Sequence, residues 1–331
     1  MAFEPLVLLW GLASDSPVTA VRDELELQAM SVPTVFVNQQ EIADIDARLM
    51  VGETIQASIR VGGQWIDLNQ VIAAYLRPYS SFHLPSIARS GPASLAWQHA
   101  ATVDDILLSW AEVTPALLVN PFSAMSGNGS KPYQLEQLRK IGWSVPDTLV
   151  TTDPEAVREF WEQHKEIIYK SVSGVRSQVS RLRPEHLTRF HSIASCPTQF
   201  QQYIRGVDHR VHVVGSEVFA CRIFSEADDY RYPGERKVEI EACALPFDVE
   251  ARCLRTAAAL QLPFAGIDLR FTPQGEWVCF EANPSPGFTY YENASGLPIG
   301  RAVAALLAGL PAMSYVESAT PEVAVAAQSR P

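Results

Sequence analysis

The chain has 331 residues, which is enough for two or three domains. Its net charge is −11, and this acidic balance argues against a general affinity for nucleic acid or for anionic membranes. Hydrophobic residues make up 47% of the chain, yet no run reaches the roughly 18 apolar residues that a membrane-spanning helix needs. A phosphorylated ligand would therefore need a local cluster of Lys and Arg on an acidic background.

The N-terminus and the cysteines indicate a cytoplasmic protein. Glu4 and Pro5 interrupt the first apolar stretch and no basic segment precedes it, so no signal peptide is predicted. The five cysteines are scattered and form no C-x-x-C pair. This pattern argues against a zinc ribbon and against a disulfide framework. We expect reduced thiols, most of them in the core.

The first third of the chain, residues 1–115, predicts a small α/β domain. Strand and helix patterns alternate in the β-α-β order that is typical of a parallel sheet. No G-x-G-x-x-G follows the first strand, so a dinucleotide fingerprint is absent. The predicted elements are strands at 6–10, 32–37 and 71–76, helices over 18–30 and 94–108, and a hairpin that turns at Gly62 and Gly63.

The next part of the chain, residues 116–205, begins with a stretch at 120–131 that is rich in Gly, Ser and Asn and predicts a linker. A helix ending at Gly142 and a second helix capped by Asp153 are then expected. The predicted elements are helices over 132–141 and 155–164, and strands at 145–151, 167–170 and 198–204.

Residues 206–310 predict a third unit, in which apolar alternation is prominent. The predicted elements are strands at 207–214 and 218–224, helices over 249–260 and 302–310, and a polar loop at 228–236. Residues 311–331 are rich in Ala, Ser, Pro and Glu and lack periodicity, which predicts a disordered tail.

Residues 264–292 carry three oxygen-bearing side chains on two apolar runs. Asp268 lies on the first run, a turn follows at 272–275, and the second run leads to Glu281 and Asn283. If the two runs pair as a hairpin, these side chains can converge. Carboxylate and amide oxygens suit a magnesium ion that bridges nucleotide phosphates. The sequence therefore predicts a magnesium site at this hairpin.

Two lysines precede the hairpin in positions suited to phosphate. Lys131 follows the predicted linker, and Lys170 ends a predicted strand. Ser173 and Gly174 lie in the next loop, where small residues allow close approach of a phosphate group. Two lysines in an acidic chain can neutralise the concentrated negative charge of ATP.

Three arginines follow these lysines along the chain. Arg210, Arg222 and Arg231 can stabilise a phosphoryl or oxyanion transition state. Arg210 also shares a strand face with Asp208, because residues two apart on a strand point the same way. An ion pair between these two residues is therefore an alternative interpretation of Arg210.

In this order, the residues resemble those of the ATP-grasp superfamily, and within it those of the RimK-like carboxylate–amine ligases. The resemblance covers residues 115–310 and rests on four segments: SKPYQLEQLRKIGWSVPDTLVTTDPE, IIYKSVSG, QFQQYIRGVDHRVHVVG and FAGIDLRF…VCFEANPSPGFTYYE. The earlier segment IRVGGQWIDLNQVIAAYLRP is similar to the N-terminal domain of peptide-cyclising members, the microviridin-type graspetide ligases. The resemblance implies a small parallel-sheet domain followed by two α+β lobes that clasp ATP.

The resemblance also implies a role for each matching position. Nucleotide contacts are expected from Lys131, Lys170, Ser173, Gly174, Gln201, Gln202, Tyr203, Ile204 and Asp208. Arginines near the γ-phosphate and the acceptor carboxylate are expected at Arg210, Arg222 and Arg231, and magnesium ligands at Asp268, Glu281 and Asn283. Gln202 departs from the pattern, since the family often has Glu there; an amide can accept a hydrogen bond from adenine but lacks the charge.

The implied activity is that of an ADP-forming ligase, which joins a carboxylate to an amine or hydroxyl with ATP and magnesium. The substrate is either a peptide that is cyclised or an amino acid or other small molecule. A nucleotide-binding regulatory module without activity is the alternative from another class. The sequence leaves a homo-oligomer open. His209 and His212 fall on opposite faces of one strand, so no shared metal site is expected and both are interpreted as structural.

Overall fold

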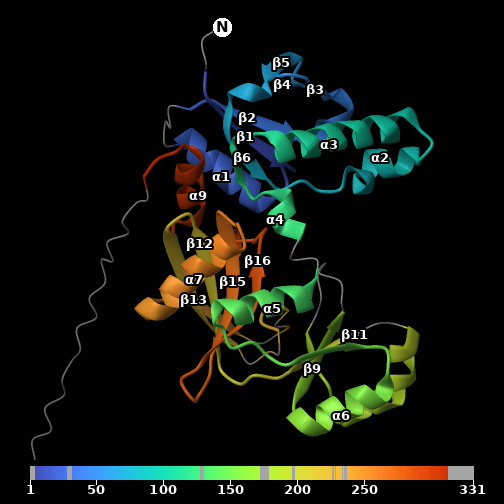
Figure 1. The fold of residues 1–331 in the computed structure, drawn as a ribbon, viewed down its shortest axis with the longest axis vertical. Helices are drawn as coiled ribbons and strands as arrows, with labels where there is room; N and C mark the ends of the chain where they lie inside the picture. The colour runs from blue at the N-terminus through green and yellow to red at the C-terminus, as the bar shows by residue number, and fades with distance from the viewer. Residues whose placement is uncertain are drawn as a thin grey trace, which may run out of the picture.

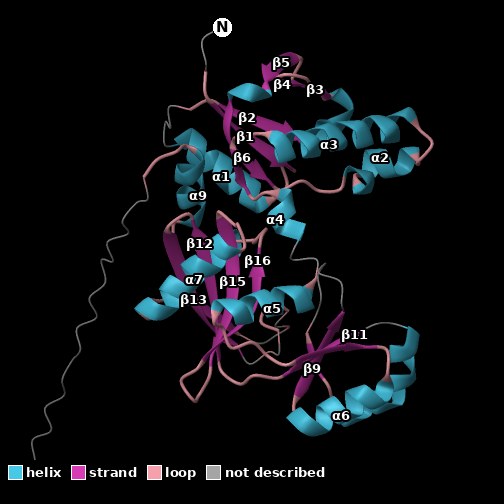
Figure 2. Ribbon diagram, viewed as in Figure 1, coloured by secondary structure: helices cyan, strands magenta, loops and turns pink. Residues whose placement is uncertain are grey.

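The structure is a computed structural model, and it describes residues 4–27, 32–126, 130–171, 179–195, 198–225, 227, 229–232, 234 and 237–311. Ser173, Gly174 and nearly all of the predicted tail lie outside these residues. The architecture confirms the prediction of a mixed α/β chain with one parallel sheet and separate antiparallel sheets (Figures 1 and 2).

The N-terminal sheet is parallel, with strand order β2-β1-β6-β7. Its strands are β1 (Leu6–Gly11), β2 (Thr34–Asn38), β6 (Val71–Leu76) and β7 (Leu117–Val119). All six residues of β1 are buried, as expected for a central parallel strand with helices on both faces. Those helices are α1 (Ser16–Leu27), α2 (Pro85–Ser90) and α3 (Leu95–Val113). β7 extends this sheet four residues beyond the boundary predicted at residue 115.

A three-stranded antiparallel sheet covers one end of the N-terminal domain (Figure 1). It is formed by β3 (Asp46–Val51), β4 (Ile55–Val61) and β5 (Gln64–Asp67). The predicted glycine turn joins β4 to β5, and both Gly62 and Gly63 have positive φ angles. β3 was not predicted, because the alternation of Asp46 and Arg48 with apolar residues lasts only four positions before the exposed Met50 breaks it. Short 3-10 turns lie at η1 (Gln39–Asp44), η2 (Leu68–Gln70) and η3 (Ser81–His83).

The central lobe is a small antiparallel sheet with order β10-β9-β11-β8. Its elements are β8 (Thr148–Thr151), α6 (Pro154–His164), β9 (Ile167–Ser171), β10 (Ser180–Arg181), η5 (Pro184–Ser195) and β11 (Thr198–Gln202). The Asp153 side chain caps α6, as predicted, by accepting a hydrogen bond from the Glu155 amide. Val157, Ile167 and Phe200 belong to an apolar cluster restricted to this lobe among the described residues.

The C-terminal sheet has five antiparallel strands in the order β14-β13-β12-β15-β16. They are β12 (Val207–Val214), β13 (Glu217–Ser225), β14 (Val238–Ala242), β15 (Phe264–Phe271) and β16 (Trp277–Asn283). The associated helices are α4 (Phe122–Ser126), α5 (Lys131–Ile141), α7 (Phe247–Ala259), α8 (Thr289–Ser295) and α9 (Ile299–Leu307).

α5 differs from its predicted place. It precedes the central lobe in sequence, yet Leu135 and Leu138 pack with Val211 and Ile267 in the core of the C-terminal sheet. Figure 1 shows α5 beside this sheet and α7. The helix begins at Lys131, so the stretch predicted as a linker contains α4 and ends at a helix.

The N-terminal domain and the C-terminal sheet share one apolar cluster. It joins Val21 of α1 and Tyr75 of β6 to Phe264 of β15 and Val303 of α9. No helix within the described ranges has the length and apolar content to cross a membrane. The four cysteines that the structure describes are free thiols, three of them buried.

Candidate active site

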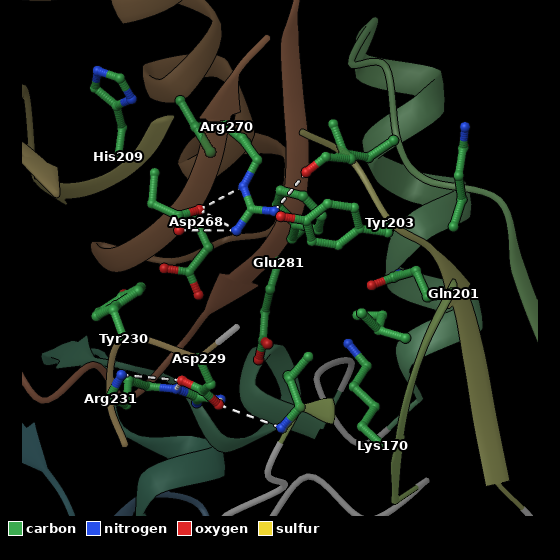
Figure 3. A pocket seen from close by; sticks show the side chains of 17 residues that line it. Lys170, Gln201, Tyr203, His209, Asp229, Tyr230, Arg231, Asp268, Arg270 and Glu281 are labelled. Carbon is green, nitrogen blue, oxygen red and sulfur yellow. Dashed lines mark hydrogen bonds and ion pairs between the residues drawn. The ribbon is translucent and has the colours of Figure 1, made fainter. Parts of the chain in front are cut away.

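A pocket opens between the central lobe and the C-terminal sheet, where β9 and β11 face β12, β15 and β16 (Figure 3). Nine residues predicted for the site line it, namely Lys170, Gln201, Gln202, Tyr203, Ile204, Asp208, Arg231, Asp268 and Glu281. Figure 3 shows Lys170 and Gln201 projecting into the pocket from one side and Asp268 from the other, with Glu281 between them. The fold thus brings together residues that are more than a hundred positions apart.

The two predicted carboxylates lie directly opposite each other on neighbouring strands. Phe271 pairs with Trp277 and Leu269 with Cys279, but Asp268 pairs with Glu281. One extra residue, Phe280, is therefore inserted into β16 as a bulge. Without this bulge the alternation would place Phe280 across from Asp268. The bulge is what brings both carboxylates to the same place on the sheet.

Each carboxylate forms an ion pair with a cation of the chain, which is half-buried in the case of Lys131 and buried in the case of Arg210. Glu281 pairs with Lys131 at the start of α5, and Asp268 accepts a 2.7 Å hydrogen bond from Nη1 of Arg210. Burial alone would raise the pKa of Glu281, but the charge and hydrogen bond of Lys131 lower it below its ordinary value. Glu281 is therefore ionised at neutral pH, as a metal ligand must be.

Asn283, the third predicted ligand, continues the same strand face and pairs in register with Gly266. Its side-chain oxygen accepts a 2.9 Å hydrogen bond from the Ser285 amide, in the turn after β16. Asn283 is not among the residues that line the pocket. The carboxylates of Asp268 and Glu281 therefore line the pocket, and the side-chain amide of Asn283 does not.

Lys170 extends from β9 toward the carboxylates. Burial lowers the pKa of its ammonium group, while the charge of Glu281 partly offsets that effect. Lys131 lies close enough to Lys170 for the two positive charges to repel. An anion placed between them would relieve this repulsion, which is the electrostatic setting that a phosphate group requires.

The predicted adenine hinge connects β11 to β12. Backbone amides of Gln202 and Tyr203 donate hydrogen bonds to the carbonyls of Asp147 and Glu166, at 2.9 and 3.0 Å. The side-chain nitrogen of Gln201, Nε2, donates a hydrogen bond to the hydroxyl of Thr148. Its side-chain oxygen, Oε1, has no partner among the described residues. Gln201 lines the pocket, so this buried oxygen is an unpaired polar atom in the pocket wall.

The ion pairs of β12 and β15 differ from the predicted alternative. Asp208 lies directly opposite Arg270, and Arg210 lies directly opposite Asp268. Asp208 accordingly pairs with Arg270, which also donates a 2.6 Å hydrogen bond to the carbonyl of Ile204 in the hinge. The two strands thus carry two cross-strand pairs instead of an Asp208–Arg210 pair. Sequence reasoning missed Arg270, whose partners are far away along the chain.

The three predicted arginines occupy different environments. Arg210 is 5% exposed and holds Asp268. Arg231 lines the pocket and pairs with Asp229 through two hydrogen bonds of 2.8 and 2.7 Å. Arg222 lies on the opposite face of the sheet, where it donates to Glu241 at 2.9 Å on the neighbouring strand. The structure therefore does not bring Arg222 to the pocket, because adjacent residues of β13 alternate between faces.

The donor set fits a magnesium ion that is shared with a nucleotide. Such an ion takes one or two protein carboxylates and completes its coordination with phosphate oxygens and water. Asp268 and Glu281 supply the two carboxylates, and in the described parts of the chain no group of three His, Cys, Asp or Glu side chains forms a self-sufficient metal cage. This arrangement can bind a metal–nucleotide complex and stabilise charge at its phosphates.

Comparisons with known proteins agree with this geometry. The model of the RimK-like ATP-grasp domain matches residues 130–307. N-acetylaspartylglutamate synthase A of Homo sapiens is 25% identical over 217 residues, covering 61% of this chain and 54% of that protein. The mouse protein is 24% identical over 280 residues, covering 79% and 69%. The chain thus spans about half the length of the human relative that it matches.

Solved structures extend the likeness to the N-terminal domain. The macrocyclase MdnC bound with precursor peptide MdnA, from Microcystis aeruginosa MRC, has a TM-score of 0.77 and 22% identity, covering 92% of this chain and 99% of that one. The ATP-grasp ligase PsnB complexed with minimal precursor, Mg and ADP has a TM-score of 0.74 and 27% identity, covering 92% and 96%. Since the family model covers more than half of its residues, the chain belongs to the RimK-like ATP-grasp family.

Proposed function

We propose that this protein is an ADP-forming ligase that activates a carboxylate with ATP and joins it to an amine or hydroxyl. The observation that carries the proposal is the pocket in which Asp268 and Glu281 face Lys170 across from the hinge. Family membership supports the same chemistry. The alternative of a nucleotide-binding module without activity is disfavoured, because both carboxylates and both lysines are present and gathered.

The residues take the following roles in this proposal. Gln201 to Ile204 hold the adenine at the hinge, Asp208 contacts the nucleotide, and Lys131 and Lys170 contact the phosphates. Asp268 and Glu281 hold magnesium, with Asn283 as a third ligand after a change of its present hydrogen bond. When bound, magnesium supplies positive charge at the transferring phosphoryl group.

The chemistry has two steps. A carboxylate oxygen of the substrate attacks the γ-phosphorus of ATP, so that a P–O bond forms, the bond to the β-phosphate oxygen breaks, and ADP leaves. An amine or hydroxyl then attacks the resulting acyl phosphate, loses a proton and displaces phosphate. In this proposal Arg231, which lines the pocket, and Arg210, which is hydrogen-bonded to Asp268, stabilise negative charge on the phosphoryl oxygens and on the tetrahedral intermediate. Arg222 would need a rearrangement of the sheet to take part, so its predicted role is not part of this proposal.

The substrate that fits best is a peptide, which would make the protein a macrocyclising ligase of the graspetide type. PsnB, at 27% identity, is described with a precursor, and its likeness includes the N-terminal domain. A small-molecule carboxylate–amine ligase is the second candidate, supported by the match to N-acetylaspartylglutamate synthase A. We expect the enzyme to act in the cytoplasm, where ATP is available, and its oligomeric state stays open.

The test is ADP release with a panel of acceptors, in wild type and in Asp268→Asn and Glu281→Gln variants. The panel contains precursor peptides rich in Thr, Ser, Asp and Glu, together with amino acids and dipeptides. We expect turnover with a peptide and a loss of at least about a hundredfold in both variants. Glu239→Gln, which removes an exposed carboxylate on β14, is the control and should behave like wild type. Nucleotide binding without turnover across the whole panel would favour the regulatory module.

A further inference from the structure

Arg210 is the most completely enclosed charged group at the site. It is 5% exposed, although a guanidinium is rarely removed from water. Its Nη1 donates to Asp268 at 2.7 Å, and its Nε donates to Nε2 of His212 at 3.4 Å. The centre of the guanidinium lies 5.4 Å from the ring of Tyr291 in α8. Contacts from three elements therefore set the direction of this side chain.

Gly266 makes room for the guanidinium. A Cβ atom built at this glycine would lie 2.1 Å from Nη2 and 2.7 Å from Cζ of Arg210, well inside contact distance. Gly266 lies directly opposite His212 in the pairing of β12 with β15, one pleat from the Arg210–Asp268 pair. The absence of a side chain at residue 266 and the imidazole at residue 212 therefore form two walls of one socket.

Apart from Arg210, the surroundings of His212 in the described structure are apolar. It is fully buried, and its ring lies 5.3 Å from that of Tyr291 and 6.2 Å from that of Phe264. Within the described residues its Nδ1 has no hydrogen-bond partner, so the hydrogen bond from Arg210 is the polar contact of the imidazole. A leucine or phenylalanine would suit such an apolar position better.

The protonation state agrees with this contact. Burial, and then the positive charge of Arg210, lower the pKa of His212 well below its ordinary value. The ring is therefore neutral, and a neutral imidazole can offer Nε2 as an acceptor to the Nε–H of Arg210. A charged imidazole could not accept this hydrogen bond.

We infer that His212 is a positioning residue for Arg210, which it holds by its Nε–H so that the guanidinium stays aimed at Asp268 and the transferring group. The inference rests on the role proposed above for Arg210. It assigns a task to a histidine that sequence reasoning interpreted as structural. Holding one N–H fixes the rotation of the planar guanidinium, which a single ion pair with Asp268 leaves free.

The test compares His212→Leu with His212→Gln, which keeps an acceptor oxygen, using ADP release with the acceptor identified by the panel. We expect His212→Leu to lower kcat by roughly tenfold or more, with little change in KM for ATP, and His212→Gln to recover much of the loss. In an Arg210→Lys background, His212→Leu should have no further effect, because a residue that acts only through Arg210 has nothing left to position.

A second readout does not depend on turnover. In protein labelled with ¹⁵N-arginine, the Nε–H signal that is lost in Arg210→Lys identifies Arg210. Its exchange with solvent should become at least about tenfold faster in His212→Leu, since the hydrogen bond is gone. His99→Leu is the control, because His99 is a partly buried histidine of α3 in the N-terminal domain, where its Nε2 lies 2.9 Å from the carbonyl of Ile45, and it does not line the pocket. It should leave both the exchange rate and kcat unchanged.

The outcomes separate the two proposals. Unchanged kcat and unchanged Nε–H exchange in His212→Leu would overturn the positioning role. A loss of kcat as large in the Arg210→Lys background as in wild type would overturn it as well. Full activity of Arg210→Lys alone would instead contradict the proposed role of Arg210. If His212→Leu does not fold, His212→Phe, which keeps a ring against Tyr291, takes its place in the same comparisons.

Discussion

At the scale of single residues, the site balances its own charges. Lys131 neutralises Glu281 and Arg210 neutralises Asp268, so each carboxylate that we assign to magnesium already has a positive partner. Charges this close interact strongly when they are partly removed from water. A metal ion must therefore compete with cations of the chain for the same oxygens, and phosphates that attract Lys131 would help it to do so.

Replacing Lys131 by Met should consequently strengthen metal binding in the absence of nucleotide. Removal of the ammonium group leaves Glu281 with an unpaired charge, which raises the affinity for a divalent cation by roughly tenfold. The measurement is Mn²⁺ binding to nucleotide-free protein, followed by electron paramagnetic resonance. Lys140→Met is the control, since Lys140 is an exposed residue of the same helix and pairs with Glu136. Equal Mn²⁺ affinity in Lys131→Met and wild type would contradict the competition.

Lys170 should make nucleotide binding depend on pH. Its pKa is lowered by burial, so in the free protein it loses its charge at a lower pH than an ordinary lysine. Since ATP binds the charged form better, affinity should be full below the pKa of Lys170 and fall as pH rises through it. The measurement is the affinity for a non-hydrolysable ATP analogue between neutral and alkaline pH. Lys170→Arg stays charged and should lose this dependence; the same decline in both proteins would rule out Lys170 as its source.

At the scale of elements, the bulge at Phe280 and the packing of helices on the C-terminal sheet position the carboxylates. α5 and α7 cover the face of the sheet opposite the socket of Arg210. Trp143, which follows α5, donates a 2.8 Å hydrogen bond from Nε1 to Oγ1 of Thr256 in α7. Both side chains are buried, so this bond joins the layer of helices within an apolar interior.

Thr256→Val should lower the free energy of unfolding by about 1–3 kcal/mol, because it leaves the buried Trp143 N–H without a partner while preserving shape. Urea unfolding followed by circular dichroism measures the change. The hydroxyl of Thr256 also donates to the carbonyl four residues earlier in its helix, at 2.8 Å. Thr102→Val is the matched control, because the Thr102 hydroxyl makes the same helical hydrogen bond at 2.8 Å but is exposed. A destabilisation of equal size in both variants would show that the Trp143 contact is unimportant.

At the scale of the whole molecule, the N-terminal domain and the C-terminal sheet behave as one packed body. They share an apolar cluster, and two polar residues join them. Arg77 at the end of β6 pairs with Asp15 at 2.6 Å and donates to Ser285 at 2.8 Å, just after β16. Asn120 binds both polar groups of the Phe264 backbone, at 2.6 and 3.0 Å, and also the carbonyl of Pro284.

Asn120→Ala should therefore destabilise the whole protein strongly. It leaves one N–H and two carbonyl groups of β15 and the turn after β16 without partners in a buried place, at a cost of at least about 3 kcal/mol. Thermal unfolding provides the measurement. Asn69→Ala is the control, because Asn69 lies exposed in a short turn of the N-terminal domain. A melting temperature as high as that of wild type would mean that the two units are held by apolar packing alone.

Local patterns in the sequence were sufficient for most elements and for the composition of the pocket. Apolar residues at alternate or successive positions predicted β6 and β12 with the bounds that the structure shows. The turn at Gly275 predicted the pairing of β15 with β16. The short helices α2 and α8 were missed, since neither is long enough to show a periodic pattern. Elements with strong periodicity are predictable because the polarity of each side chain indicates whether its position is buried or exposed, and the repeat of this pattern indicates a helix or a strand.

The partners of the charged residues could not be obtained in this way. Arg270 binds Asp208 and Ile204, Arg222 turns away from the pocket, and the extra residue Phe280 decides which side chain faces Asp268. Strand register and sheet order select these contacts, and both depend on packing between segments far apart in the chain. The sequence by itself determined which chemical groups the site contains, whereas only the tertiary structure decided their pairing, because one residue of register moves a side chain to the other face.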